Sequence, residues 1–392
     1  MKTGGKFLKI LIFALTLCAA LAITAAAADT VKSGTCGENL TWTLDTDGVL
    51  TISGSGEMED YDGYDSDAPW SAESVRSVVI QSGVTSIGAE AYYDCADLVS
   101  ISIPDSVTRI GSGAFGMCGS LESITIPDGV TRIEGQTFWG CTSLTSITIP
   151  GSVVSIENYA LYYCTGLTNI TIPDSVTNIG DNAFTDCAGL ASVSLPASLT
   201  SIGQGAFSGC SSLVNITIPS GVTRINEYTF GYCASLTDVT IPNSVTSIGN
   251  SVFERCSSLT HITIPASVTN IEGSLFKYCS ALQSIVVEAN NTKYDSRNAC
   301  NAIIETESAT LISGCGNSTI PAGVMSVDDS AFEGCDSLTH ITIPNSVKSI
   351  GVKAFANCTG LTSAAISDGV ESIGNSAFNN CQKLTTIAIP SN

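Results

Sequence analysis

A repeat solenoid is the fold class that this sequence predicts, and two observations predict it. The first is a phrase of constant length that recurs almost to the end of the 392-residue chain, with adjacent copies from Ile170 to Ser192 and from Val193 to Asn215. The second is the alternation of apolar and polar residues inside each copy. A fixed period of this size indicates stacked coils, each of which buries its apolar side only against its neighbours. An extended binding surface is therefore expected in place of a catalytic pocket.

The first element, residues 1–28, is interpreted as a signal peptide. Three lysines form a basic start, an apolar run extends from Ile10 to Ile23, and four alanines precede Asp29. The apolar run is too short to span a membrane comfortably, and the small residues fit a signal-peptidase site. The mature protein is therefore expected to be secreted or held at the cell surface, without membrane insertion after the signal is removed.

Residues 29–77 are expected to form an N-terminal β-hairpin cap. Thr41 to Leu44 and Val49 to Ser53 alternate as strands on either side of a glycine-containing turn, which is the pattern of a hairpin. The first coil of a solenoid has no predecessor, so its edge and its core need a cover. Trp42 and Trp70 are the apolar side chains expected to fill the cap.

A run of carboxylates follows within this segment, between Glu57 and Asp67. A calcium loop needs carboxylates at defined alternating positions and a bidentate glutamate. This run fits no such template, so it is interpreted as a solvated acidic loop, and no metal site is predicted.

The solenoid itself is predicted over residues 78–392. In the coil from Leu98 to Cys118, Ile101 and Ile103 alternate with serines, as in a strand with one buried side. Pro104 removes a backbone donor and ends that strand. A second short strand follows it.

The end of the same coil, around Ala114 and Phe115, is expected to form a short helical or tight turn. Because each strand is reached by a full turn of the chain, the strands of successive coils must run parallel, about 4.8 Å apart, on one face. The short second strands and the helical turns then occupy the other face.

One coil, residues 285–317, is ten residues longer than the others. Within it, Ala302 to Glu305 and Thr310 to Ser313 are expected to pair as a hairpin. Insertions in solenoids often decorate a binding surface. The alternative is a tolerated surface excursion, and the sequence leaves both open.

The repeated phrase L-x-x-I-x-I-P-x-x-V-x-x-I-G-x-x-A-F-x-x-C resembles the BspA-like (treponemal-type) leucine-rich repeat over about four fifths of the chain. The expanded coil and the entry segment around SGTCGENLTWTLDTDGVL are also similar to parts of such proteins. The resemblance implies a leucine-rich-repeat type solenoid and a bacterial surface or secreted binding protein, often described as an adhesin.

Cysteines form a further column, because nine of the 16 recur once per repeat, at the same place in the phrase, from Cys95 to Cys279. Neighbouring sites lie within disulfide range, but nine equivalent sites cannot pair completely, so mostly free buried thiols are expected. A line of sulfurs is also not the tetrahedron that zinc requires. Cys300 and Cys315 break the column and are the candidates for one disulfide, which the sequence alone leaves undecided.

Composition and motifs exclude several function classes. The net charge is −21 with 15 basic residues, so no nucleic-acid partner is expected. Nucleotide-binding glycine loops, zinc-helix motifs and nucleophile elbows are absent from the sequence, and His261 and His340 lie several coils apart. The sequence therefore predicts neither a catalytic residue nor a cofactor, and a protein that is not an enzyme.

Two surfaces are candidates for partner binding. One is the hydroxyl-rich strip of exposed strand residues, represented by Thr125, Thr148, Thr171 and Thr217. The other is an aromatic ridge in the turn columns, represented by Trp139, Tyr162 and Tyr163. Threonine favours strands with or without a partner, and packing between turns would also explain the aromatic residues.

Three functions follow from these surfaces. The leading hypothesis is an exported, adhesin-like protein that recognises a protein on a host or neighbouring cell. The first alternative is a carbohydrate-binding module that uses the aromatic ridge. The second alternative is a structural spacer within a larger cell-surface protein.

Overall fold

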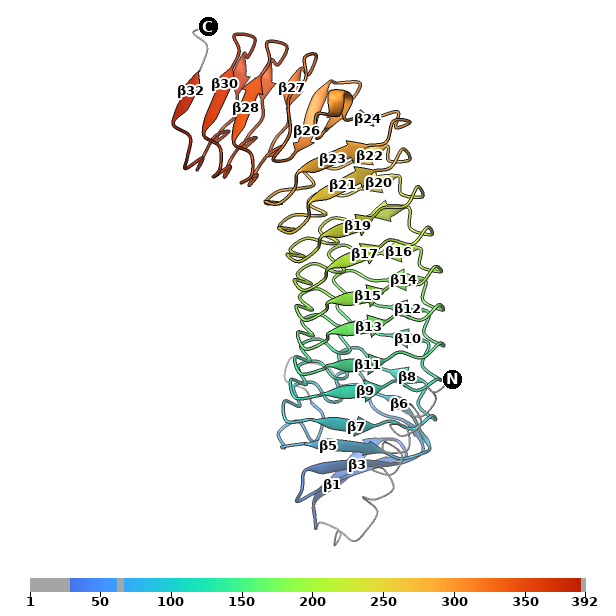
Figure 1. Ribbon diagram of the computed structural model, residues 1–392. Coiled ribbons are helices and arrows are strands. Elements are labelled where there is room, and N and C mark those ends of the chain that lie inside the picture. Colours follow the sequence, from blue (N-terminus) through green and yellow to red (C-terminus); the bar gives the residue numbers. More distant parts are fainter. Residues whose placement is uncertain (1–28, 62–66, 389–392) are drawn as a thin grey trace, which may run out of the picture.

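The computed structural model describes residues 29–61 and 67–388 (Figure 1). The chain winds into coils that stack along one axis, with the first strands at one end and β32 at the other. The predicted signal peptide, residues 1–28, lies outside the described residues. Within the described ranges, the chain forms no helix that is long and apolar enough to cross a membrane.

The first segment of the described chain is an antiparallel three-stranded arrangement. β1 (Thr30–Gly37) pairs with β2 (Leu40–Asp45), and β2 pairs with β3 (Val49–Gly54). β3 then pairs in parallel with the first strand of the coils, and the short β4 (Gly56–Glu57) pairs with the second. The hairpin strands expected here are therefore present and join the coils directly.

The two tryptophans of this segment are buried together. The rings of Trp42 and Trp70 lie 5.8 Å apart, edge to face, and the Trp70 indole N–H donates to the Ala91 carbonyl at 2.7 Å. Tyr92 of the first coil stacks on Trp70 with ring centroids 5.7 Å apart. The interior of the first segment is thus continuous with that of the coils.

Most coils contribute one strand to the front face, and the paired front strands run parallel with neighbours one repeat away, as the sequence predicts. Ser146, for example, lies opposite Ser123, and Ile147 lies opposite Ile124. The front strands are β5 (Ser77–Ile80), β7 (Ser100–Ser102), β9 (Ser123–Thr125), β11 (Ser146–Thr148), β13 (Asn169–Thr171), β15 (Ser192–Ser194), β17 (Asn215–Thr217), β19 (Asp238–Thr240), β21 (His261–Ile264), β23 (Ser284–Val287), β28 (His340–Ile343), β30 (Ser363–Ile366) and β32 (Thr386–Ala388).

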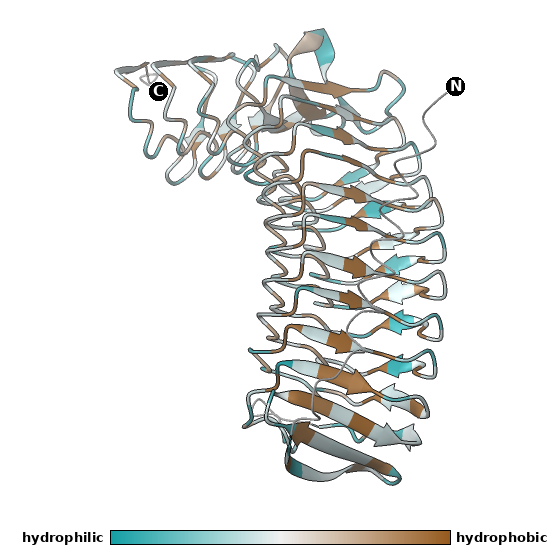
Figure 2. Cartoon of the chain, turned by 60° about the horizontal axis from the view of Figure 1, so that its bottom comes forward, coloured by the Kyte–Doolittle hydropathy of each residue, from teal (hydrophilic) through white to brown (hydrophobic). Residues whose placement is uncertain are grey.

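A second, shorter strand follows in each coil after the proline turn. These strands are β6 (Val84–Ile87), β8 (Arg109–Ile110), β10 (Arg132–Ile133), β12 (Ser155–Ile156), β14 (Asn178–Ile179), β16 (Ser201–Ile202), β18 (Arg224–Ile225), β20 (Ser247–Ile248), β22 (Asn270–Ile271), β27 (Ser326–Val327), β29 (Ser349–Ile350) and β31 (Ser372–Ile373). Figure 2 shows brown apolar segments along the front strands, consistent with one side of each strand facing the core.

The middle of the front sheet, from β9 to β23, is divided into pairs of strands, whereas β5 and β7 continue the sheet of β3, and β28, β30 and β32 form another sheet. β9 pairs with β11, β13 with β15, β17 with β19, and β21 with β23. Among the described strands, no ladder joins β11 to β13 or β15 to β17, although they are successive along the axis. The hydrogen-bonded ladder of this part of the sheet is therefore interrupted at intervals of two coils.

The helical turns expected on the other face are not helices. The Leu161 N–H donates to the Ala183 carbonyl of the next coil at 2.8 Å, whereas the Tyr162 N–H donates to the Tyr159 carbonyl, three residues back, at 3.1 Å. These two kinds of bond alternate along the segment. An α-helix would direct every N–H to the fourth preceding carbonyl. The segment instead forms tight turns, because half of its donors bond to the next coil.

Left-handed backbone recurs at two positions of each turn segment, one and five residues before the column cysteine. Glycine occupies some of these positions, but most carry a side chain at a φ that costs about 1–2 kcal/mol for an L-residue. The non-glycine members are Glu90, Asp94, Met117, Gln136, Tyr159, Tyr163, Asn182, Asp186, Tyr228, Tyr232, Ser251, Arg255, Tyr278, Ser330, Lys353, Asn357, Ser376 and Asn380.

The core consists of residue columns that run along the axis. The rings of Phe115 and Phe138 lie 5.6 Å apart and within 4° of parallel, and those of Phe184 and Phe207 lie 5.2 Å apart at 0°. Leu161 is fully buried in the same column between these two stacks. Equivalent residues of successive coils therefore meet face to face, which an in-register stack requires.

The expanded coil contains β24 (Tyr294–Asp295), the 3₁₀ helix η1 (Arg297–Ala299), β25 (Ala302–Glu305) and β26 (Thr310–Gly314). β25 and β26 are antiparallel, which confirms the expected hairpin. Ile303 belongs to the core of the preceding coils, and Ile304 belongs to the core of the following ones. This coil therefore joins two stretches of core, and in Figure 1 the coils after it lean away from the earlier axis.

Substitution at a left-handed position tests the backbone of the turns. Lys353 is exposed at φ 56°, and its N–H donates to the Asn375 carbonyl at 3.0 Å. Lys353→Gly is expected to raise the thermal midpoint, with a gain of up to about 1 kcal/mol, because glycine adopts this φ freely. Lys353→Val is expected to lower it, since a β-branched residue tolerates this φ least. Equal midpoints for the three proteins would contradict the assignment.

Candidate functional site

The threonine strip lies on the front strands, where the sequence places it. Thr125, Thr148, Thr171 and Thr217 are all exposed, on β9, β11, β13 and β17 respectively. Thr148 lies directly opposite Thr125 in a paired ladder. The strip is therefore a real surface feature, but its members are not in one continuous sheet.

Two hollows open on the front face where the sheet is divided. One has a volume of about 260 Å³, lies between β11 and β13, and includes Thr148 and Thr171 in its lining. The other has a volume of about 360 Å³, lies between β15 and β17, and includes Thr217. The division of the sheet thus creates shallow sites that the regular sequence pattern does not indicate.

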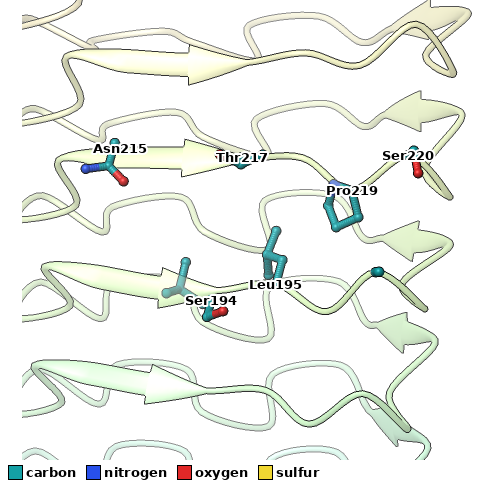
Figure 3. Close-up of a pocket in the computed structure, with 8 residues that line it drawn as sticks. Ser194, Leu195, Asn215, Thr217, Pro219 and Ser220 are labelled. Atoms are coloured by element: carbon teal, nitrogen blue, oxygen red, sulfur yellow. The ribbon is translucent and has the colours of Figure 1, made fainter.

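Figure 3 shows the larger hollow, with Asn215 and Thr217 on one coil and Ser194 and Leu195 on the neighbouring coil. Pro219 and Ser220 lie at the end of the same hollow, beyond the strand. All of the lining residues are uncharged. The hollow combines hydroxyl and amide groups with apolar surface, which suits neutral groups of a partner.

The predicted aromatic ridge is a cluster of rings in contact. The centroids of Trp139 and Tyr162 lie 6.4 Å apart, and those of Tyr162 and Tyr163 lie 6.5 Å apart. Trp139 and Tyr162 are half-buried, whereas Tyr163 is 48% exposed. Burial, followed by the negative charge of Asp186, raises the pKa of the Tyr162 hydroxyl. The structure therefore brings these three residues together, but much of their ring surface is used within the cluster.

A second aromatic group lies further along the same face and is centred on a cation. The Arg255 guanidinium lies 5.6 Å from the centre of the Tyr232 ring and 4.6 Å from that of Tyr278. Tyr228 lies close by, in a hollow shared with Tyr232. Tyr228 and Arg255 are not among the candidates that the sequence indicates. The repeat period could have found Arg255, because it lies one repeat after Tyr232 and one repeat before Tyr278.

The column cysteines are buried free thiols with a shared hydrogen-bond partner. The Cys141 thiol donates to the Phe115 carbonyl at 3.1 Å, and the same carbonyl accepts the Cys118 N–H at 3.2 Å. Ten thiols make the equivalent bond, at 2.9–3.2 Å, from Cys118, Cys141, Cys164, Cys187, Cys210, Cys233, Cys256, Cys279, Cys358 and Cys381. Each thiol therefore links its own coil to the preceding one.

Burial disfavours the thiolate form of these cysteines. It raises the pKa of the Cys141 and Cys233 thiols to about 12, from an ordinary value of 9.0. A neutral thiol is a poor nucleophile and a poor metal ligand. The column is consequently part of the packing and carries no reactive chemistry.

Cys300 and Cys315, the candidates for one disulfide, are free thiols in the structure, and each has its own hydrogen-bond partner. The Cys315 thiol donates to the Asn301 carbonyl at 3.3 Å, and the Cys300 sulfur lies 3.7 Å from the Ala302 carbonyl oxygen. Both are buried, and burial raises the pKa of each.

The polar residues that were candidates for catalysis or metal binding lie apart from one another. His261 is 3.5 Å from Asp238, and His340 contacts Thr339 and Thr362, so each histidine has only local partners. In residues 29–61 and 67–388, no group of three or more His, Cys, Asp or Glu side chains is arranged to hold a metal ion. Part of the acidic run, residues 62–66, lies outside that description.

The family model that matches this chain is that of the BspA type leucine rich repeat region, over residues 67–191, 177–302 and 312–392. No curated protein matches the chain.

Several solved structures are similar. A leucine-rich repeat protein from Bacteroides ovatus is 30% identical, with 90% of this chain and 93% of that chain covered and a TM-score of 0.60. One from Eubacterium ventriosum is 26% identical, with coverage of 92% and 97% and a TM-score of 0.58. A leucine rich cell surface protein from Faecalibacterium prausnitzii is 28% identical, with coverage of 93% and 90% and a TM-score of 0.53.

Thiol titration tests the state of the cysteines. The native protein is expected to react with a thiol reagent at pH 8 at no described cysteine except the half-buried Cys381, because the other described thiols are buried and protonated. After denaturation without reductant, every cysteine of the purified chain is expected to react. A shortfall of two thiols that disappears in the Cys300→Ser variant would instead establish the bridge to Cys315.

Alkaline pH is expected to destabilise the protein through the same column. The thiols of Cys141 and Cys233 stay protonated in the fold up to a pKa of about 12, but the unfolded chain loses these protons near pH 9. Their stabilisation is therefore complete below pH 9 and is lost as the pH rises from 9 to about 12, by about 1.4 kcal/mol per pH unit for each thiol. Thermal unfolding from pH 7.5 to 10.5 under reducing conditions measures this. A Cys233→Ala variant should show a shallower decline, and a midpoint independent of pH would contradict the account.

Proposed function

This chain belongs to the BspA type leucine rich repeat family, and from that premise we propose that it is an exported, non-enzymatic protein that binds a protein partner through its front strand face. The observation that carries the proposal is the uncharged, exposed strip with its two hollows, at β11–β13 and β15–β17. Solenoids bind partners over extended surfaces of this kind.

The division of the front sheet supports this face as the contact surface. Where no ladder joins β11 to β13, the exposed threonines Thr148 and Thr171 flank a hollow that apolar Ile147 and Ile149 also line. A partner side chain that enters the hollow would meet apolar surface at its floor and hydroxyl groups at its rim. This is the arrangement of a protein contact with a buried centre and a polar border.

Export is the second part of the proposal. Its support is the pattern of residues 1–28, together with the similarity to the Faecalibacterium prausnitzii protein, which is described as a cell surface protein. An adhesin-like role on a bacterial cell would follow from that location.

The first segment, residues 29–77, is proposed to act as the cap of the solenoid. Burial of Trp42 and Trp70 against Tyr92 supports this role, because these rings cover the apolar end of the first coil.

Lysine substitutions on the front face test the proposed contact. Thr148→Lys and Thr171→Lys each place a long cation at the rim of the same hollow, so each is expected to weaken binding by about tenfold or more. The measurement is binding of labelled protein to intact target cells, with and without protease treatment of those cells. Protease treatment should abolish the binding.

The matched control is Thr131→Lys. Thr131 is also exposed, but it lies beside β10, the short strand on the other side of the coil. This variant should bind as the unmodified protein does. Equal binding by all three variants would show that the front face is not the contact, and binding that survives protease would exclude a protein partner.

A further inference from the structure

We propose that the face of the solenoid formed by the turn segments carries a second binding site, for a neutral oligosaccharide, in a hollow beside Tyr228 and Tyr232. This tyrosine hollow has a volume of about 290 Å³ and is lined by Asn182, Gln204, Gly205, Ser208, Tyr228 and Tyr232. It is separate from the front strand face, and its occupation does not depend on the protein partner proposed above.

The tyrosine hollow is built from three successive coils. Asn182 belongs to the first, Gln204, Gly205 and Ser208 to the second, and the two tyrosines to the third. Gly205 is left-handed at φ 61° and buried, and a Cβ at this position would come within 2.5 Å of the Asn182 side-chain oxygen. The middle coil therefore has no side chain at this position, whereas the next coil has Tyr228 at the equivalent position.

Both tyrosines occupy backbone positions that disfavour them. Tyr228 has φ 53° and Tyr232 has φ 62°, and the equivalent residues of the preceding coil are Gly205 and Gly209. A tyrosine at such a position costs conformational free energy that glycine avoids. Tyr232 is 44% exposed, so burial of its ring recovers only part of that cost.

The lining provides the two kinds of contact that a sugar needs. An aromatic ring presents a negative face, which attracts the weakly positive C–H groups on one side of a pyranose. A carboxamide presents a donor and an acceptor side by side, which suits neighbouring hydroxyl groups. Within the described chain, the Gln204 carboxamide and the Tyr228 hydroxyl have no hydrogen-bond partner. The Asn182 oxygen accepts from Thr185 at 3.2 Å, which leaves its NH₂ group as a donor.

Charge favours a neutral ligand. The residues that line the tyrosine hollow are all uncharged, and the nearest cation, Arg255, is held between the rings of Tyr232 and Tyr278. With a net charge of −21, the protein as a whole would repel an acidic glycan. Arg255 also orients the Tyr232 ring, so one face of that ring is occupied and the other remains available.

The sequence-based alternative placed sugar binding at Trp139 and Tyr163, and the structure favours the tyrosine hollow over that ridge. Trp139 packs against both Tyr93 and Tyr162, with centroids 6.4 Å from each, so contacts inside the ridge account for it. Within the described part of the chain, Tyr228 and Tyr232 make no comparable contact with another aromatic ring. Tyr232 is 44% exposed and Tyr228 is half-buried, so part of each side chain remains available to a ligand.

Glycine substitutions give a test in which misfolding does not interfere. The purified protein is screened on an array of neutral oligosaccharides of hexoses and N-acetylhexosamines, and the strongest ligand is titrated calorimetrically. Tyr228→Gly and Tyr232→Gly keep the left-handed backbone and should maintain or raise the thermal midpoint. Each is nevertheless expected to weaken binding at least about tenfold, and Gln204→Ala about fivefold. Lys353→Gly, at another left-handed position, is the matched control and should bind normally.

Three results would overturn the proposal. The first is that the protein binds no oligosaccharide on the array. The second is that the Tyr228→Gly and Tyr232→Gly variants bind the oligosaccharide as tightly as the unmodified protein does. The third is that these variants lose binding to a protein ligand. The two proposed sites are distinguished by crossed variants. Thr171→Lys should leave oligosaccharide affinity unchanged, and Tyr232→Gly should leave binding to the protein partner unchanged.

Discussion

The register between successive coils is the constraint on which the rest of this structure depends. In the turn segments, N–H groups bond alternately to the next coil and to the same coil, as Leu161 and Tyr162 show. A shift of one residue would exchange these two sets and turn the apolar columns away from the core. The constant length of the repeat follows from this constraint, as do the face-to-face phenylalanine stacks and the thiols that bond to the preceding coil.

The same constraint shapes the outer surface. The turn segments, which hydrogen-bond both within their own coil and to the next, contain left-handed backbone at two positions per repeat. In most coils, residues other than glycine occupy these positions. Many side chains at these positions are exposed, Tyr159, Tyr163 and Tyr232 among them, so substitution there changes the surface while the ladder is retained. Tyr232, Arg255 and Tyr278 occupy one such column in three successive coils and form a cation–π group. The front face differs, because its residues alternate as in an ordinary strand and its distinctive features are the breaks between strand pairs.

The sequence predicts the parts of this fold that depend on periodicity and composition. The isoleucine columns, the parallel front strands and the hairpin of β25 and β26 are all found where the spacing places them. Of the two alternatives for the turn segments, a helical or a tight turn, the tight turn is found, because residues such as Leu161 bond to the next coil, and such bonds cannot be inferred from one repeat alone. The threonine strip could be predicted, but the hollows between β11 and β13 and between β15 and β17 could not, since neighbouring repeats are nearly identical in sequence.

A hydrogen-bond scalar coupling across two coils tests this account most directly. In a perdeuterated sample, the nitrogen of Leu161 should couple to the carbonyl carbon of Ala183, because these groups share a hydrogen bond with a donor–acceptor distance of 2.8 Å. The same experiment should show no coupling from Leu161 to Glu157, the fourth residue before it. A coupling to Glu157 in place of Ala183 would mean that the segment is helical and would contradict the coil-to-coil ladder.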